Sequence, residues 1–150
     1  MKVLVLGSKG QLGRCLNDQL DSTDLNVIYT SRELLDITNF EETKSKIFDF
    51  FPDIVINATA YTAVDKAEEE QEMANIINNL AVANLAKICK QLDSWLIHIS
   101  TDYVFDGNSD IPYIEDDKKN PQNIYGETKL NGELAIQSLG CNHIIIRTAW

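Results

Sequence analysis

Positively charged residues are scarce in this sequence. Its 150 residues include 13 lysines and arginines against 23 aspartates and glutamates, which gives a formal net charge of −10. A protein that binds a phosphate backbone needs clustered positive charge on its surface. The composition therefore predicts no nucleic-acid partner.

Cysteines and long apolar runs are scarce as well. The three cysteines, Cys15, Cys89 and Cys141, are far apart and form no CxxC motif or cysteine–histidine cluster, so we expect reduced thiols and no metal site. The apolar run in MKVLVLG is too short for a signal peptide, and no run approaches the about 20 residues that span a bilayer. These absences predict a soluble, cytoplasmic protein without a membrane partner.

The chain does contain a regular alternation of short apolar runs and helical periodicity, without a repeat, linker or low-complexity segment. The runs are continuous, as in parallel strands whose two faces are both covered by helices. The pattern predicts one α/β domain over residues 1–150 with a doubly wound, Rossmann-like parallel sheet. The expected strands are residues 3–6, 26–30, 53–58, 95–100 and 143–150, and the expected helices are about 11–20, 40–50, 66–92 and 123–139.

Polar residues and glycine mark the expected helix ends. Thr62 or Asp65 can cap the third helix, and Glu68–Glu70 in its first turn would face the positive end of its dipole. Gly140 would end the fourth helix. The fifth strand comes last, so the sheet either ends on a bare apolar edge or continues in a longer protein.

A glycine-rich turn, GSKGQLG at residues 7–13, follows the first strand and enters the first helix. Gly7 permits a tight turn, Gly10 lets the backbone approach a pyrophosphate, and Gly13 allows close packing of helix on strand. The helix N-terminus offers N–H groups to the phosphates. The spacing is GxxGxxG where the common fingerprint is GxGxxG; here it predicts a dinucleotide site, with a purely structural turn as the alternative.

The end of the second strand bears on which dinucleotide binds. A NAD enzyme commonly places an acid there to bond the ribose 2′-hydroxyl, whereas residues 29–32 read Tyr-Thr-Ser-Arg. Arg32 and the hydroxyls suit a 2′-phosphate, which favours NADPH. The neighbouring Glu33 leaves NADH open, and the alternative for Arg32 is an ordinary surface cation.

Tyr125 and Lys129 lie four positions apart in YGETK, on one face of the expected fourth helix. A free tyrosine has a pKa of about 10. An ammonium about 4 Å away would favour the phenolate by about 1 kcal/mol in water but by about 4 kcal/mol at the effective dielectric of a partly buried site, so the pair needs a cleft. Ser100 and Thr101 end the fourth strand, at the edge where such sheets bind ligands. Together with the dinucleotide site, these groups predict hydride transfer.

Six longer segments carry a more specific pattern, and they extend along the whole chain. They resemble the extended short-chain dehydrogenase/reductases and, within them, the dTDP-4-dehydrorhamnose reductase family. YTAVDKAE and STDYVFDG are the most specific parts. The segments are GSKGQLG (7–13), PDIVINATAYTAVDKAE (52–68), HISTDYVFDG (98–107), IPYIEDD (111–117), NIYGETKLNGE (123–133) and IIIRTAW (144–150).

The resemblance implies reduction of the C4 keto group of dTDP-4-dehydro-6-deoxy-L-mannose (dTDP-4-dehydrorhamnose) to dTDP-L-rhamnose, a step in L-rhamnose and cell-surface polysaccharide biosynthesis. NADPH would supply the hydride. Tyr125 would donate the proton to the keto oxygen, and Lys129 would lower the pKa of Tyr125 and hold the nicotinamide ribose. Thr101 would hydrogen-bond the substrate oxygen, with Asp102 and Tyr103 on the sugar side.

The resemblance also implies further contacts with the cofactor. The alternatives are that Asp36 is only a cap and Asn78 only a satisfied polar residue of a helix, while His98 is interpreted as a core histidine. The implied contacts are Gly7, Gly10, Gln11 and Leu12 around the pyrophosphate, Asp36 and Ile37 near the adenine, and Ala58, Ala60, Tyr61 and Asn78 along the cofactor.

Members of this family are longer than this chain. The part that is missing here carries the remaining strands, most of the sugar-nucleotide pocket and any metal ligands at a dimer contact, so we expect these 150 residues alone to be inactive and leave a homodimer open. One alternative function is a non-catalytic NADP-binding regulator similar to the regulatory subunit of methionine adenosyltransferase, and another is a nucleotide-sugar epimerase or dehydratase with tightly held NAD. Intact Thr101, Tyr125 and Lys129 favour an enzyme over the regulator, and Arg32 and STDYVFDG weigh against the epimerase.

Overall fold

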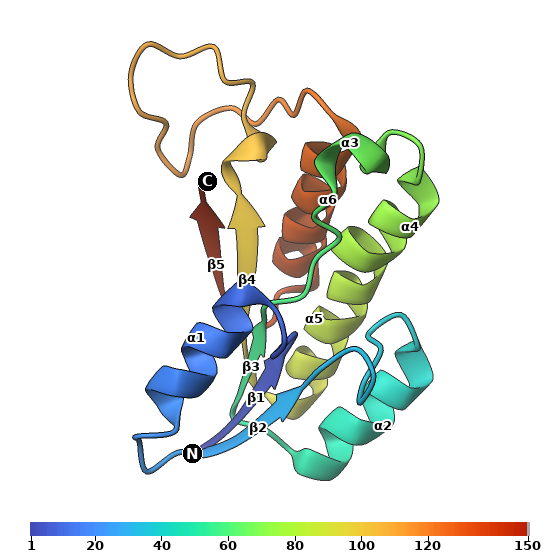
Figure 1. Ribbon diagram of the computed structural model, residues 1–150, viewed down its shortest axis with the longest axis vertical. Helices are drawn as coiled ribbons and strands as arrows, with labels where there is room; N and C mark the ends of the chain where they lie inside the picture. The colour runs from blue at the N-terminus through green and yellow to red at the C-terminus, as the bar shows by residue number, and fades with distance from the viewer. Residues whose placement is uncertain (150) are drawn as a thin grey trace.

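A five-stranded parallel sheet forms the centre of the chain, with the strand order β2-β1-β3-β4-β5 (Figure 1). The computed structural model describes residues 1–149, so Trp150, the last residue of IIIRTAW, lies outside the described residues. The predicted doubly wound α/β sheet is confirmed. The strands are β1 (Lys2–Leu6), β2 (Asn26–Thr30), β3 (Ile54–Asn57), β4 (Trp95–Thr101) and β5 (His143–Thr148).

Helices lie on both faces of this sheet. Parallel crossovers are right-handed, so the crossover from β1 to β2 and the later ones, which run the other way along the sheet, place their helices on opposite faces. Figure 1 shows α1 on one face and α2, α5 and α6 on the other. The helical elements are α1 (Gln11–Leu20), α2 (Phe40–Phe50), α3 (Val64–Ala67), α4 (Gln71–Asn75), the π-helical turn η1 (Ile76–Leu80), α5 (Ala81–Leu92), the 3₁₀ turn η2 (Asp102–Val104) and α6 (Ile124–Leu139).

The register of the strands brings two loops to one point of the sheet edge. Leu6 at the end of β1 pairs with Thr30 of β2 on one side and with Asn57 of β3 on the other. The glycine turn after Leu6 and the loop after Asn57 therefore leave the sheet side by side. The order of the strands reverses here, and open α/β sheets bind ligands at such a switch point.

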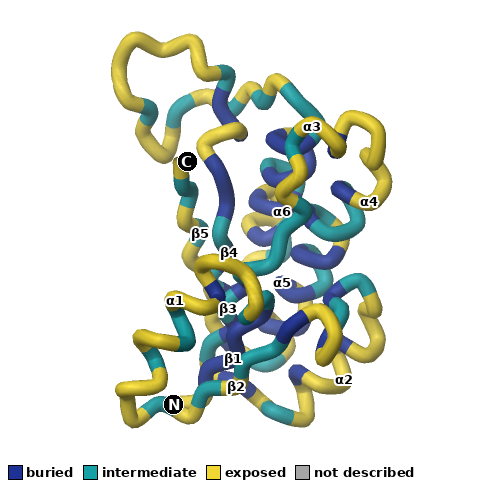
Figure 2. Tube along the Cα trace, viewed as in Figure 1, coloured by how far each residue is buried: buried dark blue, intermediate teal, exposed yellow. Residues whose placement is uncertain are grey.

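The core lies between the sheet and the layer of α2, α5 and α6, where most of the fully buried positions gather (Figure 2). β1 is buried from Val3 to Leu6, which explains its continuous apolar run. β5 differs, because Ile144 and Ile146 point away from α6 and are 47% and 43% exposed. The expectation that helices cover both faces of every strand is therefore wrong for β5 within the described residues.

The predicted third helix, residues 66–92, is not continuous. A turn at Glu68–Glu70 separates α3 from α4, and α4 continues through η1 into α5. Neither Thr62 nor Asp65 caps α3, since Ala63 precedes it without a side-chain hydrogen bond. The acidic residues make other contacts: Glu68 accepts a hydrogen bond from the backbone N–H of Ile124 at the start of α6 (2.9 Å), so these predictions of the caps and of the first turn are wrong.

The other helix boundaries agree closely with the sequence pattern. Gly140 follows α6 with φ of +66°, as predicted for a left-handed helix stop. Asn123 caps the start of α6 by accepting a hydrogen bond from the backbone N–H of Gly126 (2.7 Å). No helix among residues 1–149 has the length and apolar character needed to cross a membrane.

Candidate functional site

The glycine turn holds the start of α1 close to the end of β1. Gly7 has φ of +85°, which L-residues with a side chain rarely adopt, and a Cβ there would lie 2.8 Å from the carbonyl oxygen of Ala58. A Cβ on Gly13 would lie 2.3 Å from the Gly7 oxygen, so glycine at this position lets α1 approach the turn closely. Gly10 precedes α1 and provides no side-chain cap. The first N–H groups of α1, starting at Gln11 and Leu12, are therefore available to an anion.

The loop Ala58–Tyr61, which includes Ala60, is held in place beside this turn by a buried asparagine. Asn78 accepts a hydrogen bond from the backbone N–H of Tyr61 (2.9 Å) and donates to the carbonyl oxygen of Tyr61 (3.1 Å). Its amide also donates to the hydroxyl of Thr128 on α6 (3.2 Å). Asn78 is thus a fully satisfied polar residue of η1, and it joins the loop to α6.

Charged side chains at the end of β2 lie next to the glycine turn. Glu33 forms an ion pair with Lys9 (3.0 Å) and accepts a hydrogen bond from Ser31, and the Ser31 and Lys9 contacts lower the pKa of Glu33 to about 2. Arg32 pairs with Asp36 through Nε (3.3 Å), and its side chain is 74% exposed. Within residues 1–149 the two terminal nitrogens of Arg32 make no hydrogen bond, so they can bind an external anion, whereas Glu33 is bound to Lys9.

The side chains of Asp36 and Ile37 make local contacts. Asp36 accepts hydrogen bonds from the backbone N–H (3.0 Å) and the hydroxyl (2.8 Å) of Thr38, which is the geometry of a turn cap. Burial opposes ionisation of Asp36, but the bonds from Thr38 and Arg32 prevail and lower its pKa. Ile37 packs into the hydrophobic core. Only the backbone of Ile37 is therefore left to contact a cofactor.

The end of β4 and the start of α6 bring a threonine and two tyrosines together. The hydroxyl of Thr101 accepts a hydrogen bond from the backbone N–H of Tyr103 (3.2 Å) and donates to the carboxylate of Asp102 (3.2 Å). The rings of Tyr103 and Tyr125 meet edge to face, with their centroids 5.5 Å apart and an interplanar angle of 77°. A Cβ on Gly126 would lie 2.3 Å from the Tyr103 oxygen, so glycine is what permits this approach.

Tyr125 is 8% exposed. Burial raises its pKa, the nearby Thr101 hydroxyl acts in the opposite direction, and the Asp102 charge raises the pKa further. The phenol therefore keeps its proton near neutral pH. The expectation that Lys129 lowers the pKa of Tyr125 is wrong for this arrangement of side chains.

Lys129 is directed into the protein interior, which explains that difference. It is 2% exposed, and Nζ donates a hydrogen bond to the carbonyl oxygen of Ile99 (2.6 Å) and lies 3.4 Å from Nε2 of His98. Burial lowers the pKa of Lys129 to about 8, and the nearby charge of Glu133 opposes this. His98 is fully buried, as predicted for a core histidine, but the sequence did not reveal its contact with Lys129. In the strand register His98 pairs with Asn57 of β3.

The sequence pattern did not predict a second buried cluster, which contains Glu133. Glu133 accepts hydrogen bonds from Ser100 and from two nitrogens of Arg147, at 3.0 and 2.7 Å. These contacts join the ends of β4 and β5 to α6. The sequence does contain a feature that points to Glu133. It lies four residues after Lys129, and therefore on the same helix face as Tyr125 and Lys129.

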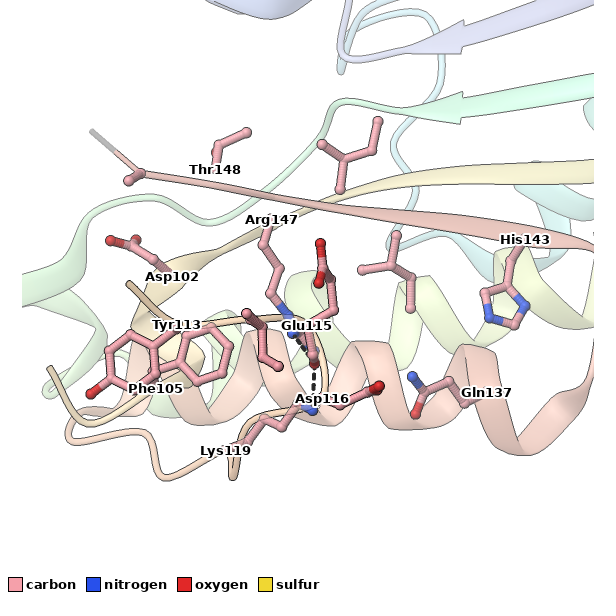
Figure 3. Close-up of a pocket in the computed structure, with 14 residues that line it drawn as sticks. Asp102, Phe105, Tyr113, Glu115, Asp116, Lys119, Gln137, His143, Arg147 and Thr148 are labelled. Carbon is pink, nitrogen blue, oxygen red and sulfur yellow. Dashed lines mark hydrogen bonds between the residues drawn. The ribbon is translucent and has the colours of Figure 1, made fainter. Parts of the chain in front are cut away.

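A hollow of about 720 Å³ opens on the β5 side of the site, between β5, α6 and the loop that follows η2 (Figure 3). Asp102 and Thr148 line it where it approaches the ends of β4 and β5. Arg147 donates a hydrogen bond to the carbonyl oxygen of Glu115 (2.9 Å) and so connects the loop to β5. No residue of the glycine turn lines this hollow, so it is separate from the start of α1. Residues 1–149 contain no group of three or more His, Cys, Asp or Glu side chains placed to hold a metal ion.

Comparison with known proteins gives a consistent set of relatives. The dTDP-4-dehydrorhamnose reductase of Escherichia coli (strain K12) is 42% identical over 153 residues, which cover 100% of this chain and 51% of that protein. A solved dTDP-4-dehydrorhamnose reductase from Clostridium acetobutylicum matches with a TM-score of 0.97 and 43% identity, over 100% of this chain and 54% of that one. The reductase from Bacillus anthracis, solved in complex with NADP, matches with a TM-score of 0.96 and 36% identity, over 99% and 53%.

The chain spans about half the length of these relatives. The family model described as RmlD substrate binding domain matches it over residues 1–150. Because that match includes every residue of the sequence, the chain belongs to the RmlD substrate binding domain family.

Proposed function

We propose that this chain is the cofactor-binding and catalytic part of an NADPH-dependent reductase. It reduces the C4 keto group of dTDP-4-dehydro-6-deoxy-L-mannose to dTDP-L-rhamnose. The observation that carries the proposal is that Thr101 and Tyr125 lie together at the carboxyl edge of the sheet that also carries the glycine turn. The NADP complex of the Bacillus anthracis relative supports the choice of cofactor.

The proposed cofactor fits the residues at the switch point. The absence of a Cβ at Gly7 and Gly10, together with the open N-terminus of α1, provides room and N–H donors for a pyrophosphate. The exposed Arg32 suits a 2′-phosphate. NADH stays the second choice because the acid at this strand end, Glu33, is paired with Lys9. The remaining proposed contacts are Gln11, Leu12, Asp36, the backbone of Ile37, Ala58, Ala60, Tyr61 and Asn78, with Tyr125 and Lys129 at the nicotinamide ribose.

Tyr125 is the proposed proton donor. Bound NADPH would supply the hydride for C4 of the sugar, and the Tyr125 phenol would give its proton to the keto oxygen, which completes the alcohol. The raised pKa of Tyr125 keeps this proton in place until the oxygen becomes basic. Thr101 hydrogen-bonds the same oxygen, and Lys129 is proposed to hold the nicotinamide ribose.

The sugar side of the site is proposed to begin at Asp102 and Tyr103. Tyr103 is partly exposed and contacts Tyr125, and Asp102 lines the hollow beside β5. The relatives are longer, and we assign the rest of the dTDP-sugar pocket to the part of the protein beyond these residues. The free cysteines suit the reducing cytoplasm, where the substrate would be met.

The alternatives explain less of the site. A non-catalytic NADP-binding regulator would have no need for the Thr101 and Tyr125 contact. An epimerase or dehydratase that holds NAD would be expected to present a free acid to the ribose 2′-hydroxyl. Here Glu33 is bound to Lys9 and Ser31, and Arg32 is the exposed group.

The proposal is tested with the full-length protein, NADPH and the dTDP-4-keto-6-deoxymannose substrate, by following the absorbance of the reduced nicotinamide. We expect turnover by the wild type and a loss of at least about 100-fold in kcat for Tyr125→Phe, because general acid catalysis contributes about this much. NADPH should still bind that variant, as measured by fluorescence, with an affinity reduced by about the 0.5 to 1.5 kcal/mol of one lost hydrogen bond to the ribose. Residues 1–150 alone should show little or no turnover. A fully active Tyr125→Phe protein would refute the assignment of the proton donor.

A further inference from the structure

His98 is a buried imidazole that the proposed reaction does not use directly. It lies on β4 between two polar partners, with Nδ1 3.1 Å from the amide nitrogen of Asn57 on β3 and Nε2 3.4 Å from Nζ of Lys129 on α6. Asn57, His98 and Lys129 are all buried. Because water is excluded, each pair of groups that face one another in this row must combine a donor with an acceptor.

The orientation of the Asn57 amide is fixed by its other contact. Its oxygen accepts hydrogen bonds from the backbone N–H of Thr59 (3.1 Å) and from the Thr59 hydroxyl. A backbone N–H can only donate, so the oxygen must face Thr59 and the NH₂ group must face His98. Nδ1 of His98 is then an acceptor, and the neutral ring carries its proton on Nε2.

An Nε2–H group faces Lys129 in this arrangement. An ammonium has three donors and no acceptor, so it would oppose the His98 N–H with another donor. An uncharged amine has a lone pair that can accept this N–H, while one of its own N–H groups donates to the Ile99 carbonyl oxygen. The observed hydrogen bonds are therefore those of uncharged Lys129.

The charges around the row allow Lys129 to lose its proton near pH 8, so that both of its protonation states are accessible. Glu133, the acid on the same face of α6, is occupied by Ser100 and by Arg147 of β5. Among residues 1–149 Lys129 forms no ion pair, and burial brings its pKa to about 8. Burial and the Lys129 charge hold the pKa of His98 well below its usual range, so the ring stays neutral near physiological pH.

We propose that His98 links the protonation of Lys129 to the loop that follows β3. The uncharged amine occurs with the Nε2–H tautomer of His98 and with the Asn57–Thr59 contacts that are observed. The ammonium occurs with the Nδ1–H tautomer, whose proton needs the Asn57 oxygen, so the amide must turn and release Thr59. His98 is thus a positioning residue, and Thr59 lies in the loop Ala58–Tyr61, beside the glycine turn. The meaning of this link for catalysis rests on the proposed reductase function.

The experiment observes the tautomer directly, in the full-length protein with ¹⁵N-labelled histidine, by NMR of the ring nitrogens between pH 6.5 and 9.5. The His98→Gln variant identifies the resonances. We expect His98 to change from Nδ1–H to Nε2–H as the pH rises through the pKa of Lys129. In Lys129→Met the ring should stay Nε2–H throughout. A wild-type tautomer that is constant over this range, or the same change in Lys129→Met, would overturn the proposal.

A kinetic arm uses Asn57→Asp. Its carboxylate accepts a hydrogen bond from Nδ1–H and so favours the tautomer that accompanies the ammonium. We expect the alkaline fall of kcat, where Lys129 loses its proton, to move up by about one pH unit. If the alkaline fall of kcat stays at the same pH in a folded Asn57→Asp protein, the proposed link between His98 and Lys129 is wrong. If the tautomer of His98 changes but the protein has no reductase activity, the proposed link is supported and the proposed reductase function is wrong. If the protein is active but the tautomer does not change, the reductase function is supported and the link is wrong.

Discussion

Lys129 is an ionisable residue whose burial has a measurable consequence for stability. Its side chain is enclosed between α6 and β4, and its polar contacts are a carbonyl oxygen and an imidazole, neither of which carries a negative charge. Burying a charged group without a counter-ion opposes folding unless the group gives up its charge. The protonation state of Lys129 should therefore be visible in unfolding experiments.

Replacing Lys129 with methionine is expected to remove a rise in stability at alkaline pH. The pKa of Lys129 is about 8 in the folded chain and about 10.4 in an unfolded one, so between these values the unfolded chain binds more protons. The free energy of unfolding then rises by about 3 kcal/mol between pH 8 and pH 10.4. Below pH 8 the folded chain bears the full cost of burying the ammonium. Urea denaturation of both proteins at pH 7 and pH 10 measures the difference. An identical pH dependence in the two proteins would contradict a buried Lys129 with a lowered pKa.

Arg32 is the residue proposed to bind the 2′-phosphate of NADPH. Arg32→Ala is expected to weaken NADPH binding by about 10- to 100-fold, since a hydrogen bond to a charged group contributes about 1.5 to 3 kcal/mol, and to leave NADH binding unchanged. Fluorescence titration of both cofactors measures this. Arg14→Ala is the matched control, because Arg14 is an exposed arginine that follows the glycine turn on α1. An unchanged NADPH preference would remove Arg32 from the cofactor site.

Single residues were predictable where spacing alone decides their placement. The interval of four placed Tyr125 and Lys129 on one helix face, and strand order placed Thr101 beside Tyr125. The pKa values were not predictable, because they depend on how deeply α6 packs against β4. The contact of Lys129 with His98 combines two elements that are distant in the chain, and neither element's pattern contains it.

At the level of elements, the strands were predicted well and the third helix was not. Each strand is a compact apolar run between polar loops, so its limits can be read locally. Residues 66–92 have helical periodicity throughout, but tertiary contacts break the helix at its start. Glu68 binds the first turn of α6 and Glu70 accepts a hydrogen bond from the Tyr61 hydroxyl (2.7 Å).

The crossing of α6 with η1 depends on Gly132. A Cβ there would lie 2.2 Å from the carbonyl oxygen of Asn78, whereas one on Gly140 would meet nothing within 4 Å. We expect Gly132→Ala to lower the free energy of unfolding by about 3 kcal/mol or more, from overpacking against backbone, and to weaken cofactor binding through Asn78.

Gly140→Ala is the control for that substitution. It should cost only about 1 to 2 kcal/mol, because the sole penalty is the left-handed φ of +66°. Urea midpoints of the two variants compare the effects. Equal losses would show that the contact between α6 and Asn78 is not tight.

At the scale of the whole molecule, the two faces of the sheet are unequal. α2, α5 and α6 cover one face, while α1 alone covers the other within the described residues. Trp95, Ile144 and Ile146 are exposed on the uncovered side, and β5 is also an edge of the sheet. The sequence predicted either a bare apolar edge at β5 or a continuation of the sheet in a longer protein. It did not predict the uncovered face. A strand has the same continuous apolar sequence whether the residues that pack on it belong to this chain or to another part of the protein.

Residues 1–150 alone are therefore expected to self-associate. An edge strand offers unpaired N–H and C=O groups to a second chain, and here the exposed Ile144 and Ile146 add apolar surface to the same strand. Sedimentation velocity over a concentration series should show dimers or larger species that increase with concentration. Ile146→Lys, which places a charge on the exposed face of β5 without touching α6, should shift the distribution toward monomer because a charge on an edge strand opposes pairing. A wild-type chain that stays monomeric at every concentration would show that this edge and face do not drive association.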